Sequence, residues 1–393
     1  MMRPYYRLRS VGFILMGDGL RRALPFFSPP PCGEGAGGRR GDTALPRPPA
    51  PPPRPSLTRG EGVCATPAPL NLAPIGFALA LAAMQAVLPS HLVAQDYPRH
   101  AVKIIVPYPA GGTADLMPRI VFDALSHKWG QPVVIENRAG AGGNIGAEAA
   151  FHAEPDGYTL IASPAPPFAI NQNLYRKLGY DPAAFVPISV MGIVPTGLVV
   201  SPAKVSATTV KDLIAYARAN PGRISSATQG NGTTSHLTSA MFQMMAKVQF
   251  VHVPYRGTAP ALQGLLAGDC DIMFDNLGVS LQLVKAGQLR LLGVATEGRM
   301  AALPEVPTIA ETLPGFSSLA WFAVAAPPRT SRDIVNKISA DIAEAIRSPD
   351  VHKRFDELSA EPVGSGPDAM ARFMREETTR WGAVIKAADV KLE

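Results

Sequence analysis

From residue 102 onward, short apolar runs alternate with longer segments whose apolar residues recur at helical spacing. VKIIVPY (102–108) has the pattern of a buried strand, and prolines separate it from the helical segment ADLMPRIVFDALSHKWG (114–130). QPVVIENR (131–138) and GYTLIAS (157–163) are two more strand-like runs, with a glycine-rich loop and a short helical segment between them. Strands and helices that alternate in this way predict a parallel sheet covered by helices.

The same alternation repeats in the second half of the chain. A helical segment with a threonine N-cap and a Pro-Gly stop comes first, and strand–loop–helix units follow it. Helices are predicted at 208–222, 334–349 and 367–388, and strands at 270–276 and 289–296. Strand–loop–helix units are predicted at 223–246 and 249–268. The repeat predicts two α/β domains, with a boundary near 195–203 and a return near 316–326.

Residues 1–70 differ in composition from the rest of the chain. They hold 14 of the 40 prolines, in runs such as PRPPAPPPRP. Such a segment cannot bury enough apolar surface to offset the entropy lost on ordering. It is either a disordered extension or a stretch upstream of the true start codon, and the second explanation is favoured.

An uncharged apolar run from Ala73 to Val87 follows, within residues 71–94. The run has the length of a signal peptide and is too short for a comfortable membrane span. Ala94 is a plausible cleavage position before Gln95. Residues 71–94 therefore predict a signal peptide and an exported, periplasmic mature chain.

Charge is unevenly distributed, although the formal net charge is +6. Residues 1–94 contain 10 arginines and 4 acidic residues, whereas residues 95–393 contain 27 basic and 27 acidic residues. The body is thus formally neutral, which argues against a nucleic-acid partner. Cys270 is the one cysteine of the body, so an intramolecular disulfide or a cysteine metal cluster is excluded there.

No motif for enzymatic chemistry stands out in the body. GAGGNIG (140–146) resembles the dinucleotide fingerprint, but its third glycine comes one residue late. The chain has no P-loop and no G-x-S-x-G elbow, and its histidines lack the spacing of a metal site. Ser163 ends a strand without an adjacent partner motif. The sequence therefore predicts no catalytic residue, no cofactor and no metal.

Two stretches echo each other, VPYPAGGTADLMPR (106–119) and VPYRGTAPALQGLL (253–266). Each is a strand ending in Val-Pro-Tyr, followed by glycine, threonine and a helix. The first amides of a helix are unpaired and carry a partial positive charge, and glycine lets a ligand approach them. The pair predicts a clamp on a small anion. Two ordinary strand–helix turns without a ligand would have the same sequence pattern. A third loop rich in glycine and hydroxyl residues, SSATQGNGTTSHL (225–237), favours a polar binding cleft over that alternative.

These stretches also carry a resemblance to a known family. PYPAGGTADLMPR, QPVVIENRAGAGGNIGAE, PDGYTL, NLYRKLGYDP, HVPYRGTAPALQGLLAGDCDIMFDN and WFAVAAPP occur in order along the body. With them the chain resembles the Bug (Bordetella uptake gene) receptors, the substrate-binding components of tripartite tricarboxylate transporters. The resemblance runs from about Gln95 to Lys391 and covers none of residues 1–70.

The resemblance implies a two-domain periplasmic binding protein of the type II-like α/β class. Each lobe would be a mixed, mainly parallel sheet flanked by helices, with residues 95–200 and 320–393 in lobe 1 and 201–319 in lobe 2. The ligand would be a small organic carboxylate held in the cleft between the lobes. The implied partner is an inner-membrane permease, and the receptor would act as a monomer. A ligand sensor that signals to a membrane partner is an alternative, and a hydrolase that uses Ser163 is a weaker one.

The resemblance also implies which residues bind the ligand. The first loop, the second loop and supporting positions elsewhere would contribute mainly backbone and hydroxyl contacts. These residues are Tyr108, Ala110, Gly111, Gly112, Thr113 and Asp115; Tyr255, Arg256, Gly257, Thr258 and Ala259; and Asn144, Ser163, Gln229, Thr233, His236 and Asp275. Each has another explanation: Asp115 suits the first turn of any helix, Arg256 suits a solvated surface, and His236 suits a helix cap.

One stretch departs from the family pattern. IASPAPPFAINQNLY (161–175) has prolines and a phenylalanine where family members often have small polar residues, at Pro164, Pro166, Pro167 and Phe168. This part of the cleft should be stiffer and more apolar. The expected ligand is therefore a carboxylate with an apolar or aromatic portion.

Overall fold

The computed structural model describes residues 97–392 of the chain. The predicted extension (1–70) and signal peptide (71–94) lie outside the described residues. Within 97–392, no helix combines the length and the apolar composition that a membrane crossing requires.

The first strands and helices form one side of a sheet with helices on both faces. Their bounds are β1 (Val102–Val106), α3 (Thr113–Trp129), β2 (Val133–Asn137), α4 (Asn144–Phe151) and β3 (Thr159–Pro164). β1 lies between β2 and β3 and is parallel to both, as the sequence predicts. Ile104 of β1 packs with the helices α3 and α9 (Arg332–Arg347) on one face, and Ile105 packs with α4 and α11 (Pro367–Ala387) on the other. The run VKIIV is apolar on both faces because both are covered.

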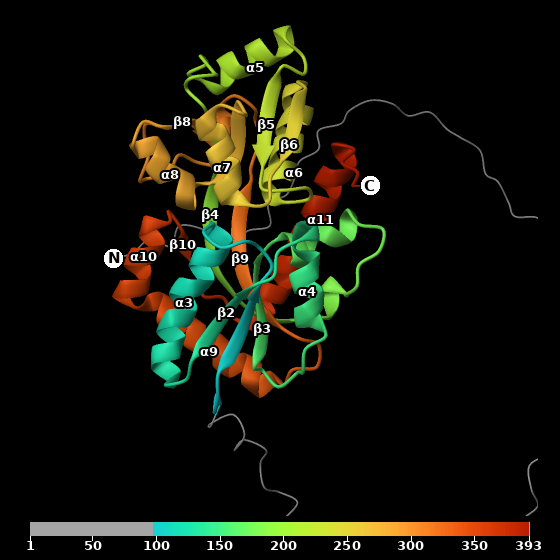
Figure 1. Cartoon of the computed structure of the whole chain (residues 1–393), viewed down its shortest axis with the longest axis vertical. Helices are drawn as coiled ribbons and strands as arrows, with labels where there is room; N and C mark the ends of the chain where they lie inside the picture. The colour runs from blue at the N-terminus through green and yellow to red at the C-terminus, as the bar shows by residue number, and fades with distance from the viewer. Residues whose placement is uncertain (1–96, 393) are drawn as a thin grey trace, which may run out of the picture. The chain divides into compact units, whose positions relative to one another are not determined.

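Two antiparallel strands run through the middle of the sheet, β4 (Val186–Val200) and β9 (Leu319–Ala326). β9 pairs with β3 on one side and with the first part of β4 on the other. The last five residues of β4, Thr196–Val200, pair instead with β7 and β8. β4 therefore passes from one group of elements into the next, and the sheet is mixed (Figure 1).

The second group of elements extends the sheet in the order β4-β7-β5-β6. Its bounds are α5 (Val210–Ala219), β5 (Ile224–Thr228), α6 (Thr234–Ala246), β6 (Phe250–Pro254), α7 (Thr258–Ala267), β7 (Ile272–Asn276), α8 (Leu277–Lys285) and β8 (Arg290–Val294). β5 is parallel to both β6 and β7. We call this group lobe 2, and the group around β1–β3 lobe 1 (Figure 1).

The C-terminal segment returns to lobe 1 as three helices. They are α9 (Arg332–Arg347), α10 (Pro349–Glu357) and α11 (Pro367–Ala387), with the short strand β10 (Glu361–Pro362) beside β4. α9 packs on β4 and α3. α11 packs on β4, on a π-helical turn η2 (Pro166–Ile170) and on α6 of lobe 2. α11 thus contacts both lobes.

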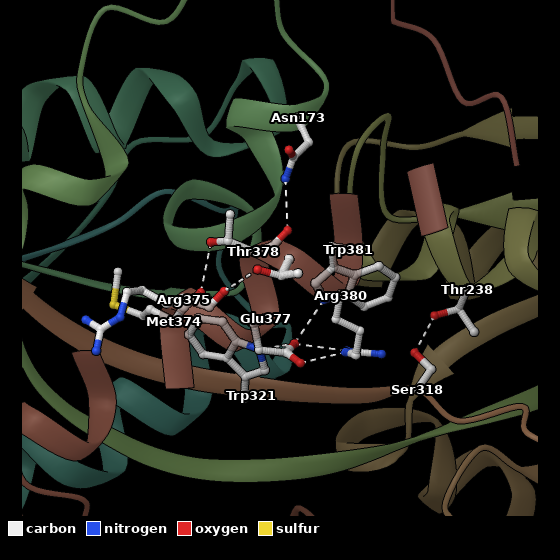
Figure 2. Close-up of polar contacts among 11 residues, drawn as sticks. Asn173, Thr238, Ser318, Trp321, Met374, Arg375, Glu377, Thr378, Arg380 and Trp381 are labelled. Carbon is white, nitrogen blue, oxygen red and sulfur yellow. Dashed lines mark hydrogen bonds and ion pairs between the residues drawn. The ribbon is translucent and has the colours of Figure 1, made fainter. Parts of the chain in front are cut away.

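A buried carboxylate fastens α11 to β9. One oxygen of Glu377, Oε2, accepts hydrogen bonds from the indole Nε1 atoms of Trp321 (2.8 Å) and Trp381 (3.0 Å). Arg380 donates to both carboxylate oxygens and lies over the Trp381 ring, with its guanidinium carbon 4.4 Å from the ring centroid. Figure 2 shows the two indoles and the arginine pointing to the same carboxylate. Since Trp321 belongs to β9, the cluster joins the last long helix to a central strand of the sheet.

Candidate ligand-binding cleft

The loops at the carboxyl ends of the strands of both lobes surround one cavity, where about 420 Å³ of space, open solvent included, is free of protein atoms. Lobe 1 lines it with residues at or after the ends of β1 and β3, and lobe 2 with residues at or after the ends of β5, β6 and β7. The lining residues are Tyr108, Pro109, Gly112, Ala114, Pro164, Pro166, Gln229, Thr233, Thr234, Gly257, Thr258 and Asn276. None of these side chains is charged.

Four helices begin at this cavity, α3, α6, α7 and α8. Their N-cap residues are Gly112, Thr233, Gly257 and Asn276, and all four line the cavity. Only Thr233 closes its own helix with a side-chain hydrogen bond. The other three helix ends keep unpaired amides, which together with the aligned peptide dipoles create a positive potential. The cavity can therefore hold an anion without a cationic side chain.

The first loop is held in place by a buried carboxylate. Asp115, which is 2% exposed, accepts hydrogen bonds from the Gly111 amide (3.0 Å), Arg119 Nε (2.9 Å) and Asn137 Nδ2 (2.9 Å). Burial raises the pKa of Asp115, but the hydrogen bonds from Arg119, Asn137 and Gly111 outweigh it and lower the pKa below its ordinary value. Gly111 has φ +88°, which glycine adopts without strain. Asp115 thus shapes the loop from behind and does not line the cavity.

The second loop faces the first across a very short gap. Gly257 has φ +107°, and its amide donates to the Gln229 carbonyl at 3.2 Å. A Cβ atom at Gly257 would lie 3.2 Å from Pro109 Cγ, and one at Gly112 would lie 2.9 Å from Thr258 Oγ1. Glycine at these two positions therefore allows the lobes to approach each other.

Behind the cavity, Gln229 binds a buried acid. Its Nε2 donates to Asp275 Oδ1 at 2.8 Å. Asp275 is fully buried, and desolvation raises its pKa to about 6, against the opposing hydrogen bonds from Ser280 and Gln229. Asp275 Oδ2 has no partner of good geometry within the described residues. The acid does not line the cavity, so its direct effect is to orient the Gln229 amide, which does.

Asp275→Asn should stabilise the protein at neutral pH. The folded-state pKa is raised, so the unfolded chain loses its proton first as the pH rises, and wild-type stability falls between about pH 4 and pH 6. The shift to about 6 corresponds to at most about 3 kcal/mol. The amide side chain of the variant cannot ionise and still offers Gln229 an acceptor. Urea unfolding of both proteins from pH 4 to 7.5 should show a difference that grows with pH.

The exposed Asp269 provides the control for this prediction. Asp269→Asn should follow the wild-type pH profile throughout. If Asp275→Asn is less stable than the wild type at pH 7.5, ionisation of Asp275 does not lower the free energy of unfolding, and the assignment of Asp275 as a carboxyl that is costly to ionise is wrong.

The third loop, at the start of α6, is closed by its own side chains. Thr233 Oγ1 donates to the Gly230 carbonyl at 2.7 Å, and His236 Nδ1 accepts from the Gly232 amide at 3.2 Å. The His236 ring stacks on His252, with 4.0 Å between ring centroids. Burial, and secondarily His252, lower the pKa of His236 to about 4, so the ring is neutral at pH 7. Thr233 lines the cavity, whereas His236 supports its loop.

Several predicted site residues have their side chains elsewhere. Asn144 Oδ1 accepts from Asn171 and Tyr180 and so ties α4 to its neighbours. Ser163 Oγ is fully buried and donates to the Pro164 carbonyl at 3.0 Å, and no base bonds to it within the described residues. The arrangement therefore offers no activated nucleophile for the hydrolase alternative.

Tyr108 and Tyr255 have the same local sequence but different surroundings. The Tyr108 ring lines the cavity, and its Oη donates to the Gly142 carbonyl at 3.3 Å. Tyr255 instead packs over α7, with its Oη 3.4 Å from Cys270 Sγ, because Gly264 leaves space for the ring there. Tyr255 therefore does not line the cavity. Arg256 is exposed and makes no ion pair within residues 97–392.

Of the residues predicted to bind the ligand, six line the cavity: Tyr108, Gly112, Gln229, Thr233, Gly257 and Thr258. Ala110, Gly111, Thr113 and Ala259 belong to the same loops without lining it. The sequence prediction missed Pro109, Ala114, Thr234 and Asn276, and it took Pro164 and Pro166 only as a departure from the family pattern. Among the described residues, no group of histidine, cysteine and acidic side chains could hold a metal ion.

The chain is similar to known proteins over nearly all of the described residues. A family model described as tripartite tricarboxylate transporter family receptor matches residues 117–390. BugT of Bordetella pertussis is 36% identical over 325 residues, which cover 82% of this chain and 98% of BugT. A protein from the tcbD-tcbE intergenic region of Pseudomonas sp. (strain P51) is 38% identical over 292 residues, which cover 74% of this chain and 86% of that one.

Solved structures have a similar fold. Rpa4515 of R. palustris with adipate has a TM-score of 0.73 and 38% identity, and the match covers 75% of this chain and 99% of that one. The periplasmic binding protein BugD has a TM-score of 0.72 and 30% identity, covering 76% and 100%. MatC of Rhodopseudomonas palustris with bound malate has a TM-score of 0.69 and 31% identity, covering 74% and 100%. The predicted fold class, a type II-like periplasmic binding protein, is confirmed.

Proposed function

Since the chain belongs to the tripartite tricarboxylate transporter receptor family, we propose that it captures a small organic carboxylate in the cleft between its lobes. The family consists of solute-binding receptors, not of enzymes. The carboxylate would contact the first amides of α3 on lobe 1 and of α7 on lobe 2. Gln229 Nε2, which gives one of its two hydrogens to Asp275, would supply a side-chain hydrogen bond from lobe 2 with the other.

The observation that carries this proposal is the meeting of four helix N-termini at one cavity that no charged side chain lines. A carboxylate gains charge-assisted hydrogen bonds from such amides, whereas a neutral solute gains much less. A cation would be repelled. The two relatives with adipate and malate bound support the choice of a carboxylate.

The remaining parts of the proposal concern the cell. Residues 71–94 would direct export, and the mature protein would work in the periplasm as a monomer. It would deliver its ligand to an inner-membrane permease of the tripartite system. Lobe 1 would consist of residues 95–200 and 320–393, and lobe 2 of residues 201–319. The chain would then cross between the lobes at the end of β4 and at the start of β9. Hinge closure over the ligand would mark the loaded receptor for the permease.

Calorimetric titration of the purified protein tests the proposal. A panel of linear and cyclic carboxylates with two to eight carbons should include at least one that binds with a dissociation constant below about 10 μM. The matching amide, which has the same shape without the charge, should bind at least about 100-fold more weakly. A panel with no binder, or an amide that binds as well as its acid, would refute the carboxylate receptor.

A further inference from the structure

One wall of the cavity differs in chemistry from the helix ends that face it. Pro164 and Pro166 line this wall, within the sequence Pro-Ala-Pro-Pro of residues 164–167. We infer that this wall selects carboxylates with an uncharged hydrocarbon body over dicarboxylates of the same length. The inference rests on the proposed function, since it takes the first carboxylate to lie at the helix N-termini.

The wall has almost no hydrogen-bond donors. Both residues that line it, Pro164 and Pro166, are prolines and carry no backbone N–H, and neither does Pro167 beside them. Ala165, which carries the remaining one, does not line the cavity. The next two amides, those of Phe168 and Ala169, donate to the Ala165 carbonyl at 3.0 and 2.9 Å. A second carboxylate placed against this wall would therefore lose its water without gaining a partner.

The wall also cannot rearrange easily to supply donors. Phe168, two residues after Pro166, lies parallel to Trp321 of β9, with 6.2 Å between ring centroids and 15° between the ring planes. The Trp321 indole in turn donates to the buried Glu377 (Figure 2). Phe168 and Trp321 are each 1% exposed. The prolines are thus attached to a fully buried part of lobe 1.

The neighbouring lining residues have the same apolar character. The Tyr108 ring and the Pro109 ring adjoin the cavity from the first loop, and Tyr108 uses its Oη to donate to the Gly142 carbonyl. The polar side chains that line the cavity, Gln229, Thr233, Thr234, Thr258 and Asn276, all come from lobe 2. An elongated ligand with its carboxylate at the loops would therefore lay its body against prolines and an aromatic ring.

Hexanoate and adipate are a matched pair for the test, because they share a six-carbon chain and differ in one terminal carboxylate. Titration of the purified protein with each should show hexanoate binding at least about 10-fold more tightly. A receptor for dicarboxylates should show the opposite preference. Two similar proteins have the dicarboxylates adipate and malate bound, so the expected result would distinguish this chain from them. Adipate binding equal to or tighter than hexanoate would overturn the inference.

Pro166→Ser adds an amide and a hydroxyl donor to the wall and should reduce the hexanoate preference at least about threefold. Pro167→Ser is the control, because Pro167 is the adjacent proline of the same turn and does not line the cavity. An unchanged ratio in P166S, or an equal change in P167S, would contradict the role of the wall. The wild-type ratio alone decides the inference if P166S fails to fold.

The outcomes separate the inference from the proposed function. If adipate and other dicarboxylates bind and hexanoate does not, the receptor stands and the selectivity is wrong. If no carboxylate of any kind binds, the proposed function fails, and the inference fails with it.

Discussion

Gly112→Val is expected to weaken carboxylate binding by at least about 100-fold, or about 2.7 kcal/mol, while lowering the free energy of unfolding by no more than about 1 kcal/mol, because valine is a poorer N-cap residue than glycine. Gly112 has φ −98°, which valine adopts readily, so lobe 1 should fold normally. Its Cβ, however, would lie 2.9 Å from Thr258 Oγ1 on lobe 2. The added side chain occupies the gap through which the lobes approach and also covers the first amides of α3. Calorimetric titration and urea unfolding of the same preparation measure the two quantities.

Gly298→Val is the matched control for this prediction. A Cβ at Gly298 meets no atom within 4 Å, and the residue does not line the cavity. The ligand affinity of the Gly298→Val variant should equal that of the wild type. If Gly112→Val binds the ligand as tightly as Gly298→Val does, the two loops do not hold the ligand between them.

Glu377→Ala is expected to reduce the free energy of unfolding by about 3–5 kcal/mol, the range found when one member of a buried ion pair is removed. The change leaves the Arg380 guanidinium, whose side chain is only 17% exposed, without its carboxylate. It also removes the acceptor for two buried indole N–H groups, those of Trp321 and Trp381. Urea unfolding followed by tryptophan fluorescence should show a lower midpoint and an altered native emission.

Glu376→Ala tests whether the effect depends on the buried site. Glu376 is the preceding residue of the same helix and is exposed, so its loss should change stability by less than about 0.5 kcal/mol. Glu377→Gln should lie between the two, because the amide oxygen can still accept from an indole. Equal effects at positions 376 and 377 would mean that the cluster in Figure 2 does not anchor α11.

The sequence predicted the repeating part of the fold well, for a simple physical reason. β1, β2, β5 and β6 are each followed by a glycine-containing loop and a helix, and β3 and β7 are short, mainly apolar runs, so these six strands could be recognised along the chain. α8 was missed because it begins directly at the end of β7, with no loop between Asn276 and Leu277. α10 was missed because Ser348 ends α9 and caps the next helix at once. The long path of β4 depends on its partners in both lobes, which no local pattern reveals.

The candidate site was predictable at the level of loops and much less so at the level of side chains. Glycine and threonine at the starts of α3 and α7 marked the two facing loops. The directions of the side chains depend on neighbours distant in the sequence, as the two tyrosines show. Tyr255 turns toward Gly264, whereas Tyr108 stays at the cavity. Asp115 has the residue type of a ligand contact, but Arg119 and Asn137 already occupy its carboxylate.

A crystal structure of the protein with the tightest-binding carboxylate from the titration panel would show directly how the ligand is held. We expect the carboxylate oxygens to lie within about 3.2 Å of backbone nitrogens in the first turns of α3 and α7, between Gly112 and Thr258. We expect no arginine or lysine to contact them. A carboxylate paired with Arg256, or bound outside the cleft, would contradict capture by the helix N-termini.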